Sequence, residues 1–305
     1  MHPSFRPQSL SISLLKKPNN PHPMKIPPFQ LVFLLLLGSC IYSHTPEENT
    51  IKDDTAVDFS YSAPEEDQGS FSEDSFRTER RKIGLGKART ASVDISIPAG
   101  ILSVKGGTPD LAEVSIKYRK ERRFLIKQDL TGDHLYAKLY MPKIEGLKEI
   151  SDDRTICSIR MNEKVPMDLS LNMGAGKGKF DLSGLNLRTV SMSLGAGEFT
   201  VNLKGTSATN VKVNAGVGEA TVDLSGKRKE ELDAEFNCGI GTLRLILPRS
   251  AGVKVSLSGL IGNTDMGELV RKGSYFYNDA WETGAPRMRI DINGGIGDVK
   301  ITMAE

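Results

Sequence analysis

Apolar and polar residues alternate along most of the second half of the chain, on either side of a glycine motif that recurs. Successive copies of the motif lie 21 to 23 residues apart, except for a last interval of 35 residues. A fixed period of roughly 20–50 residues is typical of stacked structural repeats. The Gly-x-Gly copies are at 174–176, 195–197, 216–218, 239–241 and 295–297, with a degenerate copy at 260–262 and an earlier one that ends at Gly100.

The apolar positions keep the same distance from each copy of the motif. Leu171 and Met173 precede Gly176 by five and three residues, and Phe180 and Leu182 follow it by four and six. Alternation with a period of two predicts strands that bury one face. Each repeat is therefore predicted to be a strand, a glycine turn with positive φ, a second strand and a return loop.

One such repeat has too few aliphatic side chains to offset the backbone entropy that is lost when it becomes ordered. We expect neighbouring repeats to stack in register as parallel ladders about 4.8 Å apart. The product is an all-β fold, a β-solenoid, in which Val201, Val222 and Leu245 form one apolar column. The strand that ends near Met303 is predicted to be an open last rung that can pair with a second copy of the chain.

Less regular alternation precedes the glycine motifs, as in Val114, Ile116 and Tyr118. It predicts the first rungs and a cap over 82–165, so that the solenoid domain covers 82–305. No long amphipathic helix is predicted anywhere in the chain, because no segment keeps a helical spacing of apolar residues for more than about one turn.

The segment 29–37, FQLVFLLLL, is a short apolar run that follows Lys25. As a helix it is about 14 Å long, too short for a hydrocarbon core of about 30 Å, so it predicts an export signal rather than a membrane span. The residues 37–40, Leu-Gly-Ser-Cys, resemble the lipobox of bacterial lipoproteins. The resemblance implies that Cys40 carries acyl chains such as palmitate and anchors the protein to a membrane. Ordinary cleavage and release as a soluble secreted protein is the alternative.

Residues 1–39 are therefore predicted to be a lipoprotein signal peptide, and within it 1–23 reads as a mis-assigned start because Met24 makes the better beginning. Acidic residues dominate the next segment, where 41–80 has eleven acidic and three basic residues. Such a segment buries too little apolar area to become ordered. We expect 40–81 to be the lipidated cysteine and a disordered acidic linker, with a reach of about 35 Å.

Lysine and arginine number 40 against 38 acidic residues, a balance that excludes a strongly basic nucleic-acid binder.

The segments SVDISIPAGILSVKGGTPDLAEVSIKY at 92–118 and VPMDLSLNMGAGKGKFDLSGLNLRTVSMSLGAGEFTVNL at 165–203 resemble the opening and middle of the bacterial toast-rack domain. YFYNDAW followed by RMRIDINGGIGDVKITM resembles its end, and related putative-adhesin domains share the glycine-rich repeats. The resemblance implies a right-handed single-stranded β-solenoid in the bacterial envelope, with no established chemistry. The lipobox departs from the family's multi-span regulators.

The Gly-x-Gly copies are weak candidates for phosphate loops, because those loops need a helix after the glycines and here a second strand follows. Glu198 and Glu219 occupy the same outward place on adjacent rungs, a spacing close to that of the two carboxyls of a retaining glycosidase. Two solvated glutamates on an ordinary charged face are the alternative. Asp181, Asn202 and Asp223 form another outward row, which suits Ca²⁺ or a plain solvated ladder.

Five cations fall within 117–123. Because the protein is predicted to be exported, the anionic polymers of the cell envelope are the expected partners of such a cluster. The cations favour an anionic glycan over nucleic acid, with a solvated strand end or contact with the acidic linker as alternatives. The candidate ligand-binding residues in this cluster are Lys117, Arg119, Lys120, Arg122 and Arg123.

Aromatic residues gather in the 35-residue interval, which holds the only tryptophan. We expect them to pack against or cap the solenoid, and a binding site is the alternative. The residues are Tyr275, Phe276, Tyr277 and Trp281, of which Tyr275, Tyr277 and Trp281 are candidate ligand-binding residues.

Cys157 and Cys238 alternate with apolar neighbours, so both are predicted to face inward as buried free thiols. A disulfide between them, which export permits, is the alternative. His134, the only histidine of the predicted domain, is expected at the surface without a partner constellation.

The sequence thus predicts a non-enzymatic cell-envelope lipoprotein without cofactor or metal, used for display, adhesion or binding. Its predicted partners are a membrane through Cys40 and an anionic glycan or another envelope protein, and not nucleic acid. The outer membrane or the cell surface is favoured over the inner membrane. An envelope-stress signalling partner, a solenoid polysaccharide hydrolase or lyase, and a purely structural spacer are the alternatives.

Overall fold

The computed structural model describes residues 75–142, 155–259, 261–283 and 286–305. The predicted signal peptide, Cys40 and the acidic linker up to residue 74 lie outside the described residues. The predictions for those segments are therefore not tested by the structure.

Strands make up most of the described residues, as the alternation predicted, and the all-β class is confirmed. The one helix among the described residues, α1, has four residues and follows the aromatic segment. The elements are β1 (Phe76–Ile83), β2 (Thr90–Gly106), β3 (Ala112–Arg119), β4 (Leu125–Thr131), β5 (His134–Tyr140), β6 (Ile156–Met161), β7 (Met167–Asp181), β8 (Leu187–Asn202), β9 (Asn210–Asp223), β10 (Leu232–Pro248), β11 (Gly252–Ser258), β12 (Thr264–Asp265), β13 (Val270–Lys272), β14 (Tyr275–Tyr277), α1 (Ala280–Thr283) and β15 (Arg287–Ala304).

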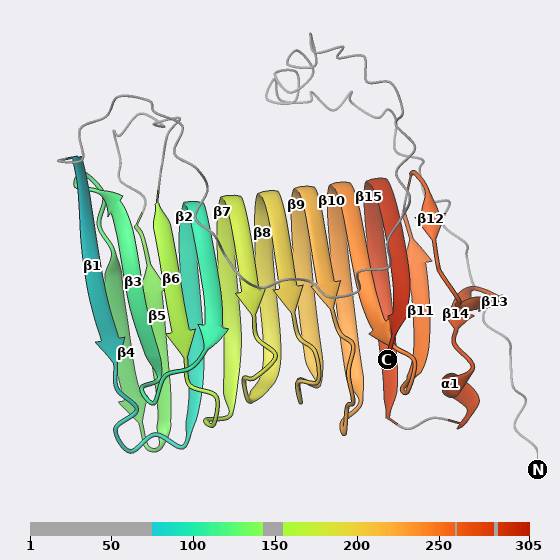
Figure 1. Ribbon diagram of the computed structural model, residues 1–305, viewed down its shortest axis with the longest axis horizontal. Helices are drawn as coiled ribbons and strands as arrows, with labels where there is room; N and C mark the ends of the chain where they lie inside the picture. The colour runs from blue at the N-terminus through green and yellow to red at the C-terminus, as the bar shows by residue number, and fades with distance from the viewer. Residues whose placement is uncertain (1–74, 143–154, 260, 284–285) are drawn as a thin grey trace, which may run out of the picture. The chain divides into compact units, whose positions relative to one another are not determined.

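Six long strands form the central rungs of the solenoid and stand side by side in Figure 1: β2, β7, β8, β9, β10 and β15. Neighbouring rungs pair in parallel along their whole length, through both sides of the glycine motif. The buried side chains of both halves of the rungs belong to one hydrophobic cluster. The chain therefore bends at each motif and folds its two halves around a shared core.

The bend changes which residues face inward. Leu171 and Met173 are buried before the motif of β7, whereas Phe180 and Leu182 are buried after it, so the inward set passes from odd to even numbers. Gly176 makes this change with a φ of 119°, as predicted for the turn. A Cβ at this position would lie 2.0 Å from the carbonyl oxygen of Gly100 on the previous rung, so only glycine fits.

Matching aliphatic residues stack as predicted. Val201 pairs with Val222, and Val222 pairs with Leu245, in the parallel register of β8, β9 and β10. All three side chains are buried. The sequence analysis missed a further inward column two residues after the second glycine, where Phe199 and its neighbours are buried. In β7 that position is Gly178, and the rings of Phe180 and Phe199 occupy the space its side chain would need.

The order of the rungs differs from the order of the sequence. β15 lies between β10 and β11, so the prediction of an open last rung at Met303 is wrong. The physical reason is the length of the matching ladders. β15 pairs with β10 from Leu232 to Pro248, whereas the degenerate copy supplies only the short strands β11 and β12, which pair with β15 from its other side. β14 and β13 then continue from β11 in antiparallel pairing.

At the other end, β5 and β6 pair in parallel with the two halves of β2, and β4, β3 and β1 follow in antiparallel pairing. β1 already begins at Phe76, before the predicted domain boundary at residue 82. On this strand Glu79 accepts a hydrogen bond from the Tyr118 hydroxyl and pairs with Arg81 at 2.9 Å. Charged residues on the core-facing side of an outer strand oppose edge-to-edge aggregation.

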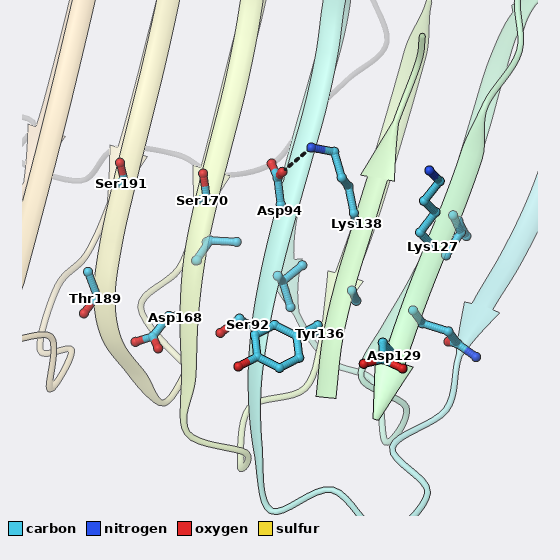
Figure 2. Close-up of a pocket in the computed structure, with 15 residues that line it drawn as sticks. Ser92, Asp94, Lys127, Asp129, Tyr136, Lys138, Asp168, Ser170, Thr189 and Ser191 are labelled. Carbon is cyan, nitrogen blue, oxygen red and sulfur yellow. Dashed lines mark ion pairs between the residues drawn. The ribbon is translucent and has the colours of Figure 1, made fainter. Parts of the chain in front are cut away.

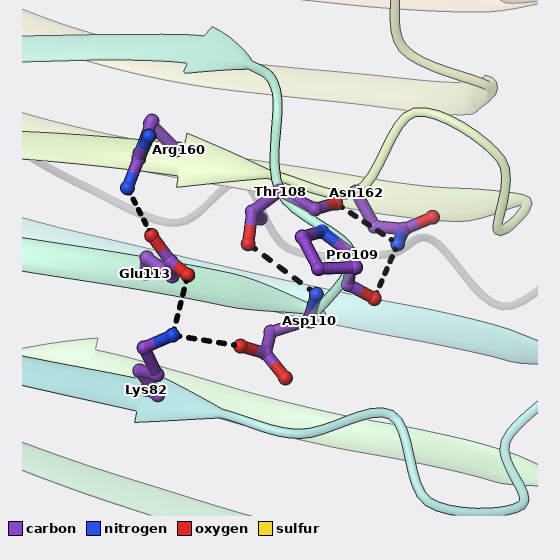
Figure 3. Close-up of polar contacts among 7 residues, drawn as sticks. All are labelled: Lys82, Thr108, Pro109, Asp110, Glu113, Arg160 and Asn162. Carbon is purple, nitrogen blue, oxygen red and sulfur yellow. Dashed lines mark hydrogen bonds and ion pairs between the residues drawn. The ribbon is translucent and has the colours of Figure 1, made fainter.

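A buried amide joins two loops near this end (Figure 3). The Asn162 Nδ2 donates to the carbonyl oxygens of Thr108 at 3.2 Å and Pro109 at 2.9 Å, and its Oδ1 accepts from the N–H groups of Lys164 and Val165. Because the amide is fully satisfied, it holds the β2–β3 loop against the β6–β7 loop. Among the described residues, no helix is both long enough and apolar enough to cross a membrane.

Candidate functional site

The principal candidate site is a groove on the outer face of five strands: β4, β5, β2, β7 and β8 (Figure 2). Its volume is about 930 Å³. The outward positions of an alternating strand are set by the same period of two that fixes the core, so buried residues between them position these side chains. The groove therefore lies on paired strands rather than on a loop.

The register places the lining side chains in rows across the strands. One row runs from Asp129 through Tyr136, Ser92 and Asp168 to Thr189. Successive positions in a row are separated by the strand spacing of about 4.8 Å.

The adjacent row in the groove carries more charge. It runs from Lys127 through Lys138, Asp94 and Ser170 to Ser191. Together the two rows present hydroxyl, carboxylate and ammonium groups at regular intervals (Figure 2).

Tyr136 is the one aromatic side chain among the groove-lining residues, and it is 51% exposed. Its ring lies over β2 and is drawn nearly face-on in Figure 2. The His134 ring packs against this ring at an interplanar angle of 63°, with 4.3 Å between the ring centroids. The His134 ring nitrogens in turn lie 2.8 Å from the Thr90 hydroxyl and 2.9 Å from the Ser92 hydroxyl.

His134 therefore differs from its prediction as a surface residue without partners, because it is half-buried and bonded to two side chains. The sequence analysis also missed Tyr136. The signal that could have found both is the alternation of 134–140, whose outward positions carry a histidine, two tyrosines and a lysine.

Ion pairs neutralise two of the groove carboxylates. The Lys138 Nζ lies 2.8 Å from Asp94, and this carboxylate holds the pKa of Lys138 above its ordinary value. At the neighbouring rung, Arg188 pairs with Asp168 at 2.7 Å. Paired in this way, the carboxylates still have free lone pairs toward the groove, since a carboxylate accepts about four hydrogen bonds.

The basic cluster of the sequence analysis lies at the N-terminal end of the solenoid. Lys117 and Arg119 belong to β3, and the other three cations follow in the turn before β4. Arg119 pairs with Glu121 at 3.4 Å, and Lys117 lies over the Phe76 ring at 5.5 Å. β1 places Arg80 opposite Ser115, which lies two residues before Lys117 on β3. Arg80 therefore adds a cation beside this cluster.

The aromatic residues lie at the opposite end (Figure 1). Phe276 packs against the core, as predicted for a capping role. Tyr277 has its ring centroid 6.2 Å from Tyr275 and 5.6 Å from Trp281. Three cations accompany these rings: Lys254 lies over Tyr275 at 3.7 Å, Lys272 over Tyr277 at 6.0 Å and Arg287 over Trp281 at 5.0 Å.

The predicted ligand-binding residues therefore fall into two groups at opposite ends of the rung series, β1–β3 and β13–β14. They do not form one site. Each group is a separate basic surface, and the second is also aromatic.

The two glutamates that suggested a glycosidase do share a register position on β8 and β9. Each is engaged with its own cation: Glu198 pairs with Lys177 at 3.0 Å, and Glu219 pairs with Arg244 at 2.9 Å. Both side chains are more than half exposed. This arrangement is an ordinary charged face, because nothing desolvates either carboxyl to make it a general acid.

The oxygen row Asp181, Asn202 and Asp223 also follows the register. Its groups stabilise the return turns: Asp181 accepts from Asn202 at 3.0 Å, and Asp223 accepts from the Ser225 N–H at 2.8 Å. In the described part of the chain, no group of three or more histidine, cysteine or acidic residues is placed to hold a metal ion.

Both described cysteines are free thiols, which answers the question of their pairing. Cys157 faces inward as predicted and is buried, whereas Cys238 lies at the glycine bend of β10 and is half-buried. Burial raises the pKa of the Cys157 thiol to about 12 and that of Cys238 to about 11. Neither is therefore a reactive nucleophile at neutral pH.

The glycine bends expose a column of side chains whose size grows toward the last rung. The middle residue of the motif is alanine in β7 and β8, and valine or isoleucine in the later copies. The aliphatic members Val217, Ile240, Ile296 and Ile261 are each more than half exposed.

A family model for the N-terminal domain of toast_rack, DUF2154, matches residues 70–218 and 205–246. The match covers more than half of the chain, and the chain belongs to this family. Among curated proteins, none matches the chain.

One solved structure shares the fold. The chain resembles a "putative cell adhesion protein" from Clostridium sporogenes, with 19% identity and a TM-score of 0.58 over 75% of this chain and 100% of that one. It is also similar to a "putative adhesin" from Bacteroides fragilis, with 10% identity and a TM-score of 0.28 over 74% of this chain and 97% of that one. The first likeness supports the stacked all-β architecture.

Proposed function

We propose that this protein is a non-enzymatic binding scaffold of the bacterial cell envelope, held at a membrane by acyl chains on Cys40 and used for adhesion or display. The observation that carries the proposal is the outer face of the solenoid. Its rows of polar side chains are repeated at a fixed spacing and are open to solvent, which suits a long, regular partner. The toast-rack family and the adhesion-named structural neighbour support the same class of function.

The anchor completes the proposal. Cys40 lies 35 residues before Ser75, the first described residue of the domain. A flexible segment of that length has a typical reach of about 30–35 Å, enough to hold the domain clear of a membrane surface. The two basic ends then provide secondary contacts for anionic glycans or another envelope protein, through Lys117 to Arg123 at one end and Tyr275, Tyr277 and Trp281 at the other.

Mass spectrometry of the mature N-terminus tests the anchor. An acylated Cys40 is expected, and the Cys40→Ser variant should lose both the acyl mass and membrane association. An unmodified N-terminus downstream of residue 40 would refute the anchor.

Protease treatment of intact cells tests the location. Cleavage of the folded domain is expected for an adhesin at the cell surface. If the domain survives while a surface control protein is cleaved, the protein faces inward, and the envelope-stress partner becomes the better interpretation.

A further inference from the structure

We infer that the groove across β4, β5, β2, β7 and β8 binds an extended neutral glycan, with the Tyr136 ring as its stacking platform. The inference rests on the proposed binding function and names the ligand class of its principal site. Its volume of about 930 Å³ is in the range of about 300–1,000 Å³ that ligand sites occupy.

Tyr136 supplies the apolar contact. A pyranose ring presents a face of C–H bonds, and such a face packs against an exposed aromatic ring. Tyr136 is half-exposed, and its ring turns a face outward over β2 (Figure 2). Tyrosine suits this role because it combines a large rigid contact area with a hydroxyl at its tip.

The platform is held in place before any ligand arrives. His134 packs against the Tyr136 ring with 4.3 Å between the centroids, and the hydroxyls of Thr90 and Ser92 fix the two imidazole nitrogens. A binding side chain that is already ordered loses less entropy when it binds. The contacts beneath Tyr136 therefore favour affinity as well as position.

Polar groups continue from the ring along the same row. Ser92, Asp168 and Thr189 take the next three register positions, on β2, β7 and β8. Their separation of about 4.8 Å per strand is close to the advance of an extended glycan per sugar unit. Hydroxyl and carboxylate oxygens at that interval accept hydrogen bonds from successive sugar hydroxyls.

Charge decides between a neutral and an anionic glycan. The lining has three carboxylates, Asp94, Asp129 and Asp168, against two ammonium groups, Lys127 and Lys138. Asp94 and Lys138 already neutralise each other, and Asp168 is paired with Arg188. A polyanion would meet at least as much repulsion as attraction there, so the groove selects an uncharged chain. Anionic polymers belong to the basic ends.

Binding assays with the full-length protein test the inference, using cellohexaose and chitohexaose as neutral probes and polygalacturonate as the acidic probe. Wild type is expected to bind at least one neutral probe with little change between low and high salt. The Tyr136→Ala variant should lose about tenfold or more in affinity, whereas Tyr136→Phe keeps the ring and most of the affinity. Ile156→Ala, which shortens an exposed side chain of β6 that does not line the groove, should bind like wild type.

Three results would overturn the inference. The first is no binding of either neutral probe by wild type. The second is equal binding by wild type and Tyr136→Ala. The third is binding of polygalacturonate alone that salt abolishes, which would point to the basic ends. None of these results bears on the acylation of Cys40 or on surface exposure, so the proposed scaffold function stands or falls separately.

Discussion

Gly197 lies directly over Gly176, so close that a Cβ built on Gly197 would be 1.8 Å from the Gly176 carbonyl oxygen. The same close approach recurs from Gly218 onto Gly197 and from Gly241 onto Gly218. The bends of successive rungs therefore stack backbone on backbone, and the repeated glycine is a packing requirement as well as a turn residue.

Substitution of Gly197 by alanine tests this packing. The residue has a φ of 148°, so the variant suffers both backbone strain and a clash with the rung beneath. We expect a loss of about 3 kcal/mol or more in the free energy of unfolding, measured by chemical denaturation. Gly84→Ala is the matched control, because nothing lies within 4 Å of its Cβ position. A similar loss in both variants would contradict the stacking argument.

Removal of the Asn162 amide should loosen the N-terminal end of the solenoid. Asn162→Ala leaves two N–H groups and two carbonyl oxygens without their partner, which we expect to cost about 2–4 kcal/mol. Asn186→Ala removes an exposed amide that donates to the Lys164 carbonyl at 3.1 Å, and should cost less than about 0.5 kcal/mol. Thermal melts of the two variants provide the comparison, and equal melting temperatures would contradict the proposed role of the Asn162 amide in joining the two loops.

The thiols should be inert in the folded protein. Because burial raises the pKa of Cys157 to about 12 and of Cys238 to about 11, almost no thiolate is present at pH 8. Iodoacetamide should leave both unmodified in the native protein and label both in guanidinium chloride. Peptide mapping separates them from Cys40, and as the guanidinium chloride concentration is raised, Cys238, which is only half-buried, should be labelled before Cys157. Rapid labelling of native Cys157 would show that this side chain is not buried.

Acid should weaken the β1 edge through Glu79. The hydrogen bond from Tyr118 and the nearby Arg81 and Arg77 hold the pKa of Glu79 below its ordinary value of 4.5. Its stabilising contribution is therefore complete above about pH 4.5 and is lost as the pH falls through the lowered pKa. Glu79→Gln should destabilise the protein at pH 7, and the difference from wild type should shrink by pH 3.

Denaturation midpoints at the two pH values measure this effect. The exposed Glu230→Gln is the control and should behave like wild type at both. A difference between Glu79→Gln and wild type that does not change with pH would show that the carboxylate charge is not what stabilises the edge.

The interior could be predicted from the sequence because the repeats stack in register. Residues at the same distance from successive glycine motifs therefore lie over one another in one column. The apolar residues at fixed distances from each glycine pair give the register of Val201, Val222 and Leu245 directly. The position of β15 could not be predicted in this way. The alternation of apolar residues in β15 is compatible with any rung as its neighbour. Its pairing with β10 depends on which two strands form the longer ladder.

The groove could be predicted only in part. Sequence alternation indicates that Tyr136 and Lys138 point outward from their strand, but not which strands become its neighbours. β5 and β7 approach the groove from opposite sides of β2, although a long segment of chain separates them. The anionic-ligand prediction drew on the run of cations at 117–123, which lies at the N-terminal end of the rung series instead.

Disulfide trapping of the rung order tests the central claim most directly, because every exposed face depends on which strands are neighbours. Thr242 on β10 pairs with Asp298 on β15. The Asn263 N–H, just before β12, donates to the Asp298 carboxylate from the other side of β15. The double variant Thr242→Cys/Asp298→Cys should form a disulfide under mild oxidation, whereas Thr242→Cys/Asn263→Cys should not, since β15 stands between them. Cross-linking of the second pair and not the first would contradict the account.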